Sequence, residues 1–383
     1  MRRRTLALIL AASSSLALSA LPAAADSDTQ GDERSCAHAA DGFAACDAHV
    51  RTKNAKPDAT TTWGGHGYSP AQLKAAYGLT GLDATTPIAV VDAYAHPNAA
   101  ADLAVYRTQF GLGTANLTQY GQNGTSALPA ANTGWGQEQM LDLEMVSAIC
   151  PSCPIIYVGA TSASFTDLGT AVNTAVAKGA KVVSNSYGGS ESSSETSIQS
   201  TYFTHPGVAI TVSSGDSGYG AASPAAFNTV TAVGGTSLVL NADGTRQSET
   251  VWSGAGSGCS AYIAKPAWQH DTSCARRTIS DVSAVADPAT GVAVYDSYGS
   301  TGGANWYVFG GTSVAAPIIG GSYGLSGVTA GTPASIAYAN PGALFDVVSG
   351  SNTRRCRAGY LCSAVTGYDG PTGLGTPNGI AAF

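Results

Sequence analysis

Short apolar runs alternate with segments of helical periodicity through the middle of the chain. Four runs have the length and composition of buried parallel strands: residues 87–92, 155–158, 181–186 and 208–212. Helical segments lie at 98–110, at 165–177 and through Ile198 and Tyr202, and Ser69 with Pro70 begins an earlier helix. This alternation predicts an α/β fold, with a central, mostly parallel sheet that has helices on both faces.

The N-terminal 63 residues differ from the rest of the chain. Arg2, Arg3 and Arg4 precede an apolar run over residues 6–21, and Ala23–Ala25 resembles a cleavage site, so residues 1–25 are expected to be a secretory signal peptide. Residues 26–63 are polar and show little periodicity, and we expect them to form a short, loose extension. Residues 64–383 then form one domain.

Composition narrows the class of protein. Hydrophobic residues make up 44% of the 383 residues and charged residues 11%, which favours a large buried core. A net charge of −7 argues against nucleic acid as a partner. No later segment has the apolar length of a membrane span. We expect a secreted, extracellular monomer.

The eight cysteines fall into four pairs of sequence neighbours. An even number in an exported chain predicts disulfides, with neighbour pairing as the simplest arrangement: Cys36–Cys46, Cys150–Cys153, Cys259–Cys274 and Cys356–Cys362. Cys150 and Cys153 could instead form a redox motif, but they follow a predicted helix rather than starting one. Zinc is less favoured, because no histidines nearby complete a ligand set.

Residues 310–317 carry the most specific chemical signal. A Gly-Thr-Ser turn leads into a helix of small residues, which presents Ser313 at a helix N-terminus, where the helix dipole and free N–H groups favour negative charge. Pro317 is expected in the first turn, where a missing N–H costs little. An ordinary serine cap is the alternative interpretation.

A nucleophilic serine needs a base, and the histidines do not supply an obvious one. None of the six lies in the His-Gly-Thr-His setting of subtilisin-like enzymes: His38, His49, His66, His96, His205 and His270. We interpret His96, in a polar turn, as a surface loop residue.

Two acidic residues are the candidates for the base that Ser313 needs. Glu138 and Asp142 are four residues apart, so both carboxylates share one face of a helix, where mutual repulsion raises one pKa and favours a shared proton. Glu144 lies about 240° further round and is a poor candidate. The alternative is a solvated acidic face.

Asp216 follows the predicted strand at 208–212 in a glycine-rich turn. A protonated aspartate donates a hydrogen bond to an oxyanion, whereas an ionised one repels it. A turn aspartate bonded to its own backbone is the alternative.

Together these segments resemble the sedolisin family of serine-carboxyl peptidases, from about Tyr68 to the C-terminus. Residues 232–237 and 281–288 also carry the resemblance. It implies a subtilisin-like fold, a Glu138–Asp142–Ser313 triad with Asp216 in the oxyanion hole, and acid-favoured hydrolysis of protein or peptide substrates through an acyl-enzyme. It further implies a substrate-binding strand edge made of Ser184, Asn185, Ser186, Tyr187 and Gly188.

The resemblance also implies one structural Ca²⁺ near the C-terminus. Asp346 and Asp369 would supply carboxylates, and backbone carbonyls would come from Val347, Val365 and Gly367. Two turn aspartates are the alternative, and the 356–362 insertion separates the two halves.

The sequence departs from the family's usual pattern in its N-terminal region, which bears on how activity is regulated. Family members typically carry a long N-terminal activation domain, but only about 40 residues separate the predicted signal from the resemblance. A catalytically silent, secreted binding protein on the same fold is therefore the first alternative. A thiol-disulfide enzyme using Cys150 and Cys153 is the second, and a histidine-based subtilisin lacks its motif.

Overall fold

The computed structural model describes residues 31–52, 66–299, 305–327 and 331–383. The predicted signal peptide lies outside these residues. The main sheet has eight strands, seven of them in the order β11-β10-β9-β7-β4-β6-β5, while β14 also pairs with β10. In chain order these are β4 (Ile88–Ala93), β5 (Leu117–Gly121), β6 (Ile155–Ala160), β7 (Val182–Asn185), β9 (Ala209–Ser213), β10 (Thr231–Leu240), β11 (Arg246–Val251) and β14 (Val282–Val285).

All pairings in this sheet are parallel except that of β10 with the edge strand β11. Successive side chains of a strand point to opposite faces. In β4, Ile88 and Val90 therefore enter one apolar core, whereas Ala89 and Val91 enter the other. Burial on both faces explains why the strands appear as continuous apolar runs in the sequence.

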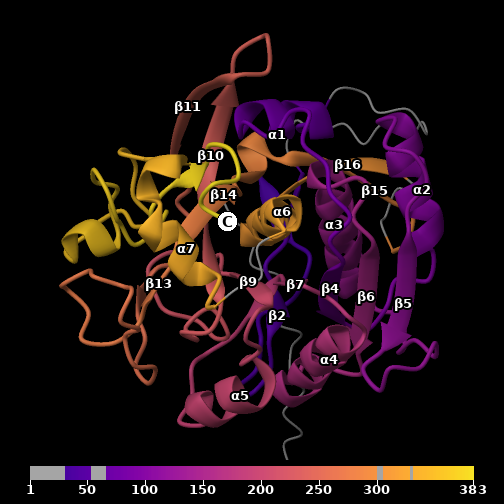
Figure 1. Cartoon of the computed structure of the whole chain (residues 1–383), viewed down its shortest axis with the longest axis horizontal. Coiled ribbons are helices and arrows are strands. Elements are labelled where there is room, and N and C mark those ends of the chain that lie inside the picture. Colours follow the sequence, from indigo (N-terminus) through magenta and orange to yellow (C-terminus); the bar gives the residue numbers. More distant parts are fainter. Residues whose placement is uncertain (1–30, 53–65, 300–304, 328–330) are drawn as a thin grey trace, which may run out of the picture.

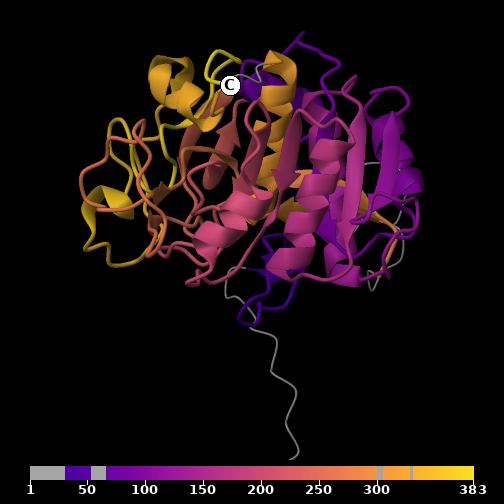
Figure 2. The ribbon, with the colours of Figure 1, turned by 60° about the horizontal axis from the view of Figure 1, so that its bottom comes forward.

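Helices cover both faces of the sheet. On the side of Ile88 lie α1 (Pro70–Ala76), α2 (Ala99–Gln109), α3 (Thr133–Ile149) and α6 (Thr312–Ser326). On the other side lie α4 (Phe165–Ala177) and α5 (Glu195–Tyr202). Figure 2 shows the sheet between α4 and α5 in front and α6 behind it. Ser69 caps α1 through a capping box with Gln72, as its sequence predicted.

Residues 31–52, the described part of the predicted N-terminal extension, form strands, in contrast to the loose extension that we expected. A second sheet has the order β1-β3-β16-β15, made of β1 (Asp32–Arg34), β3 (His49–Arg51), β16 (Asn305–Gly310) and β15 (Val292–Asp296). Between β1 and β3, β2 (Ala45–Cys46) pairs with β8 (Tyr187–Gly188). In Figure 1 this indigo segment lies beneath α6. The boundaries 26–63 and 64–383 stay predictions.

The C-terminal third adds short elements around the end of the sheet. They are β12 (Gly258–Cys259), β13 (Thr278–Ile279), η1 (Pro288–Thr290), α7 (Ala334–Ala339), η2 (Pro341–Ala343), β17 (Leu344–Phe345), η3 (Gly359–Leu361) and β18 (Thr376–Pro377). The four predicted disulfides are all present. Within the described ranges, no helix combines the length and the apolar character that crossing a membrane requires.

The predicted fold class is confirmed. The sheet is parallel through its centre, helices pack on both faces, and the topology is that of subtilisin-like folds. Helix α6 runs across the middle of the sheet and packs on α3, so residues near the start of α6 meet one face of α3.

Candidate active site

Ser313 is the second residue of α6, and Gly311 is its N-cap. Gly311 has φ +100°, a conformation that favours glycine. A Cβ at this position would lie 1.9 Å from the Asp47 carbonyl oxygen and 2.7 Å from Asp216 Oδ2, so no side chain fits. The turn therefore lets other backbone and carboxyl oxygens approach the free N–H groups at the start of the helix.

Pro317 lies in the second turn of α6, not in the first as predicted. A residue with an N–H at this position would donate to the carbonyl of Ser313, four residues earlier, and proline leaves that carbonyl free. Ser186 Oγ lies 3.4 Å from the Ser313 carbonyl oxygen and donates to Asp142 Oδ1 at 2.8 Å. The proline thus gives the nucleophile's backbone a contact with the residue that also holds Asp142.

Glu138 and Asp142 project from one face of α3, and neither side chain is exposed. This excludes the solvated acidic face. Asn132 is the N-cap of α3, and its side chain accepts from the Trp135 N–H at 3.1 Å. Glu144 points elsewhere and accepts from the Tyr295 N–H at 3.0 Å, as its rotation around the helix predicted.

Burial raises the pKa of Glu138 well above its ordinary value, and the nearby Asp142 and Asp92 raise it further. The Ser313 hydroxyl is close enough to lower that pKa in part. Ser313 Oγ itself donates to the Ser186 carbonyl at 3.3 Å. Neither Glu138 oxygen lies within full hydrogen-bonding geometry of a donor among the described residues. The carboxyl group thus stands beside the hydroxyl without accepting its proton.

Asp92 is a member of this acid cluster that the sequence reasoning missed. It ends the apolar run of β4, is fully buried, and raises the pKa of Asp142, whose own burial is the larger cause. Burial likewise raises the pKa of Asp92. Three buried carboxyl groups that raise one another's pKa in this way cannot all be ionised, so at least one of them carries a proton.

Asp216 follows β9 and contacts the start of α6. Its Oδ1 accepts from the Thr312 N–H at 2.8 Å and from Thr312 Oγ1 at 2.7 Å. Thr312 Oγ1 in turn accepts from the Gly215 N–H at 3.2 Å, which fixes the hydroxyl as a donor to Asp216. Any proton on Asp216 must therefore be on Oδ2, the oxygen that faces the Gly311 turn. The self-bonded turn aspartate is not what the structure has.

The five predicted substrate-binding residues differ from one another in what their side chains and backbone contact. The Asn185 side chain donates to the backbone carbonyls of Val183 and Thr211, and Tyr187 donates to Asn185, so both side chains serve the fold. Ser184 is buried. Within this set, the backbone of Ser186 and of β8 forms the edge that faces the serine.

That edge is already paired with the chain's own N-terminal segment. Ala45 lies opposite Gly188 and Cys46 opposite Tyr187, in antiparallel register. The Asp47 N–H donates to the Ser186 carbonyl at 3.3 Å. The Ser313 N–H donates to the Asp47 carbonyl at 3.2 Å, so a peptide carbonyl sits against the serine's backbone amide.

A charged network joins this segment to Asp216. His49 lies between two carboxylates, with Nδ1 2.5 Å from Asp32 Oδ2 and Nε2 3.3 Å from Asp216 Oδ2. Burial lowers the pKa of His49, but the two aspartates outweigh it and raise that pKa to about 9. Arg34 donates to the Asp216 carbonyl at 2.9 Å. Sequence reasoning missed His49, because it searched only for a subtilisin histidine motif.

A cavity of about 270 Å³ opens beside this segment. Its walls come from Gly188–Ser190 on one side and from Ser214–Ala222 on the other, with Arg34, His38 and Asp47 from the N-terminal segment. Because the walls are mostly backbone and small side chains, the cavity has room for a side chain of a bound peptide.

The predicted calcium ligands lie together near the C-terminus. Asp346 Oδ2 accepts from the Gly367 N–H at 2.9 Å, and Asp369 accepts from the Val365 N–H at 3.3 Å and from Thr372. Burial raises the pKa of Asp369 to about 7, and Asp346 adds to this. No cationic side chain of the described ranges forms an ion pair with either acid. Two neighbouring acids without a cationic side chain are the kind of carboxylate ligands that a hard cation takes.

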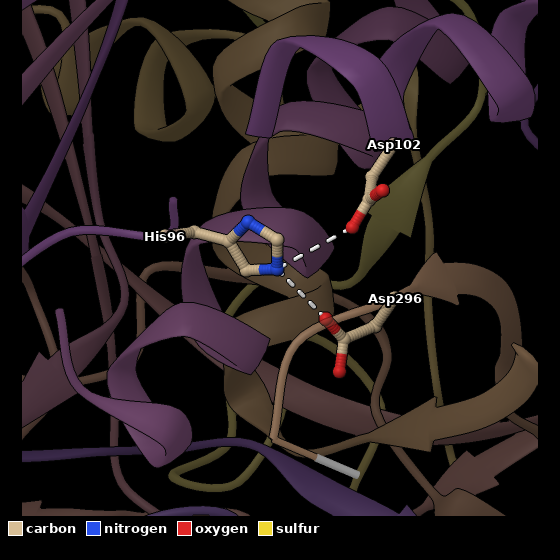
Figure 3. Close-up of side chains that lie close together, drawn as sticks. All are labelled: His96, Asp102 and Asp296. Carbon is tan, nitrogen blue, oxygen red and sulfur yellow. Dashed lines mark hydrogen bonds and ion pairs between the residues drawn. The ribbon is translucent and has the colours of Figure 1, made fainter. Parts of the chain in front are cut away.

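His96 is buried, which corrects its interpretation as a surface residue. Its Nε2 lies 2.8 Å from Asp296 Oδ1 and 3.4 Å from Asp102 Oδ2 (Figure 3), a grouping close enough to be considered as a metal site. The Asn98 N–H donates to Nδ1 at 3.0 Å, so Nε2 carries the proton that Asp296 accepts. A protonated nitrogen does not bind a metal, and we assign this cluster a structural role.

The second alternative, a thiol-disulfide enzyme, does not fit the structure. Cys150 and Cys153 are bonded to each other and are 0% and 2% exposed. A redox disulfide must be reached by a partner thiol, so this bridge is structural.

Two known proteins are similar to this chain over most of its length. The chain is 30% identical to sedolisin of Pseudomonas sp. (strain 101) over 361 residues, which is 81% of this chain and 60% of that protein. It is 29% identical to kumamolisin of Bacillus sp. (strain MN-32) over 373 residues, 86% of this chain and 64% of the relative. The chain thus spans less than two thirds of the length of these relatives. No family model matches it.

Solved structures extend the comparison. Pseudomonas sedolisin, a serine-carboxyl proteinase solved with two molecules of pseudo-iodotyrostatin, matches with a TM-score of 0.71 and 28% identity, over 82% of this chain and 95% of that one. A lanthipeptide protease matches over 82% of this chain and 92% of its own, with 13% identity and a TM-score of 0.54, which shows the fold alone.

The fold is subtilisin-like, and it places a helix-borne serine near a buried acid pair; the sedolisin structure that it matches is that of a serine-carboxyl proteinase. More particularly, the similarity to sedolisin and kumamolisin over most of this chain supports a sedolisin-family, kumamolisin-like protein.

Proposed function

We propose that this chain is a secreted serine-carboxyl endopeptidase that hydrolyses protein or peptide substrates. The observation that carries the proposal is the pair Glu138 and Asp142, fully buried on α3 with the Ser313 hydroxyl beside Glu138. Burying two acids without a cationic partner lowers the stability of the fold. A role in proton transfer at the serine gives a functional reason for keeping them there.

In the proposed reaction, Ser313 Oγ attacks the substrate carbonyl carbon while its proton moves to Glu138. Asp142 orients Glu138 and shares its proton, and the Ser186 hydroxyl holds Asp142. The bond to the leaving nitrogen then breaks as Glu138 returns the proton to the amine, which leaves an acyl-enzyme. Water attacks this ester in the second half, with Glu138 again accepting and returning the proton.

The Ser313 N–H and Asp216 are the proposed oxyanion donors. Since Oδ1 of Asp216 is occupied by Thr312, only a proton on Oδ2 makes this acid a donor. We therefore expect activity to be favoured at acid pH.

Substrate backbone is expected to pair with the edge formed by Ser186 to Gly188. An extended peptide that adds a strand to a sheet edge gains backbone hydrogen bonds whatever its sequence, which suits a broad protein substrate range. The neighbouring cavity would receive the side chain before the cleaved bond.

The test is cleavage of a protein substrate from pH 3 to 8 by the purified chain, beside Ser313→Ala and Glu138→Gln. Both variants should lose cleavage while keeping the thermal unfolding temperature of the parent. Full activity of either folded variant would refute the assigned roles.

The second candidate is a catalytically silent binding protein on the same fold. The occupied edge of β8 is the observation that favours it. A small serine-directed acylating probe separates the two, because it labels Ser313 only where the acid pair activates the hydroxyl.

We also propose one structural Ca²⁺, with Asp346, Asp369 and the carbonyls of Val347, Val365 and Gly367 as ligands. The absence of a cationic partner for the two acids among the described residues supports it. Calcium titration followed by thermal unfolding, with Asp346→Asn as control, tests this site.

Export rests on the N-terminal pattern of three arginines, an apolar run and small residues. The mass of protein recovered from the medium should place the mature N-terminus near Asp26. We propose that the mature protein is an extracellular monomer, which its mass in solution would test.

A further inference from the structure

The N-terminal segment lies along the cleft in the way that a bound peptide would. Its Ala45 and Cys46 add an antiparallel strand to β8, and the Asp47 N–H continues that pairing to the Ser186 carbonyl. Backbone pairing at a strand edge is a common mode of peptide recognition. The segment therefore uses the surface that the proposed function assigns to substrate.

Register places one peptide bond at the nucleophile. The Asp47 carbonyl oxygen accepts from the Ser313 N–H at 3.2 Å, and it lies beside Gly311, where Asp216 Oδ2 is also found. One proposed oxyanion donor, the Ser313 N–H, thus contacts this carbonyl, and the other, Asp216, lies at the same glycine turn. The following bond, to Ala48, is the bond that would be cleaved.

We propose that residues 32–51 are a built-in inhibitor of this chain's own site, seated like a substrate with the Asp47–Ala48 bond at Ser313. This inference rests on the proposed peptidase function.

Anchors on both sides of the bond explain why the segment inhibits rather than being consumed. On the leaving side, His49 and Val50 pair with Gly310 and Phe309 of β16 and also with β1. If Ser313 attacked Asp47, its proton would pass through Glu138 to the Ala48 nitrogen, and this amine would stay in place. The amine could then attack the ester and restore the peptide bond before water replaced it.

On the acyl side, the Cys36–Cys46 disulfide closes the loop directly before Asp47. Charge adds to this anchoring: His49 faces Asp32 and Asp216, while Arg34 and Asp47 are the other charged groups near it. Through its Nε2, 3.3 Å from Asp216 Oδ2, His49 also ties the segment to the oxygen that the proposed reaction assigns to the oxyanion.

The structure offers a way to displace the segment without touching the proposed catalytic groups. A Cβ on Gly134 would lie 2.1 Å from the Ser35 carbonyl oxygen and 3.5 Å from Cys36 Cα. Gly134→Leu should therefore push the segment away from α3. Gly342→Leu is the matched control, because a Cβ there meets nothing within 4 Å.

Two measurements test the proposal. Hydrogen exchange in a Ser313→Ala background should show protected amides at residues 45–51 in the full chain and faster exchange after Gly134→Leu. A tethered segment has an effective concentration on the order of 1 mM, so peptide hydrolysis at pH 6 should rise at least about tenfold in Gly134→Leu. Gly342→Leu should change neither result.

A second variant, Cys36→Ala with Cys46→Ala, should raise hydrolysis in the same direction if Gly134→Leu fails to fold. Unprotected amides at 45–51 in the parent, rapid cleavage after Asp47, or unchanged hydrolysis after displacement would each overturn the inhibitor. If neither form hydrolyses peptide nor is acylated at Ser313, the peptidase function itself fails, and the inhibitor with it.

Discussion

Asp216 offers the sharpest test of the proposed chemistry, because its two oxygens have different surroundings. Thr312 donates to Oδ1 through both its N–H and its hydroxyl. In Asp216→Asn the amide oxygen should keep these two bonds, which leaves Nδ2 at the place of Oδ2. The variant would then present a permanent donor to the oxyanion, whatever the pH.

The magnitude follows from the number of donors. Losing one oxyanion-hole donor typically costs about 10²–10³ in kcat, equivalent to about 3–4 kcal/mol. We expect a loss of this size for Asp216→Ala at pH 4. Asp216→Asn should remain within about tenfold of the parent at pH 4, and its activity should fall less between pH 4 and pH 7 than that of the parent.

The assay is kcat for a fluorogenic peptide from pH 3 to 8, measured in the parent and in the Gly134→Leu background. Thermal unfolding of each variant controls for folding. Two results would refute the reasoning: activity of Asp216→Ala within threefold of the parent at pH 4, or a pH profile of Asp216→Asn that falls as steeply as that of the parent.

Four other predictions follow from the structure. Glu138→Gln should lower kcat by about 10²–10⁴, the usual contribution of a general base, while leaving KM within a few-fold, as steady-state kinetics would measure. Burial and Asp216 raise the pKa of Asp47 from 3.8 to about 7, so its neutral form stabilises the seated segment at low pH and this contribution is lost as pH rises through about 7. The rate ratio of Gly134→Leu to parent should therefore fall between about pH 4 and pH 7 and level off above pH 7, and a constant ratio would argue against this; Asp47→Asn should lack the change. Asp281→Ala should cost about 3–5 kcal/mol in urea unfolding, because it leaves fully buried Arg277 without its carboxylate, whereas Asp243→Ala, at an exposed turn, should leave the urea midpoint nearly unchanged. Chelation of calcium should lower the unfolding temperature of the parent but not that of Asp346→Asn.

The central sheet could be predicted because its strands are buried on both faces. Continuous apolar runs such as that of β4 mark such strands, and α1 and α4 have caps or breakers at their ends. Glu138 and Asp142 could be paired from helical periodicity alone, since four residues make little more than one turn.

The remaining site residues depend on contacts between distant parts of the chain. Asp92 is visible in the sequence as the acid that ends an apolar run. The carboxyl groups that it interacts with are on α3, 46 or more residues away, and no local sequence pattern joins them to it. His96 lies in a polar turn, and only Asp296, 200 residues further on, makes its burial possible. Strands β1 to β3 have two or three residues each, too few for any periodicity, and they are stabilised by pairing with β8 and β16.

The Cys36–Cys46 disulfide has a consequence for the covalent topology of the chain. Both cysteines precede Asp47, and the bridge spans a sequence separation of 10. A cut by another protease inside this loop would leave every residue covalently attached, so the segment would stay tethered beside the serine. A cut between Asp47 and the body of the domain would divide the protein into two pieces with no bond between them. Because of the position of the bridge, the segment is therefore either fully attached or fully released. Only a cut in the peptide bonds that follow Cys46 releases it.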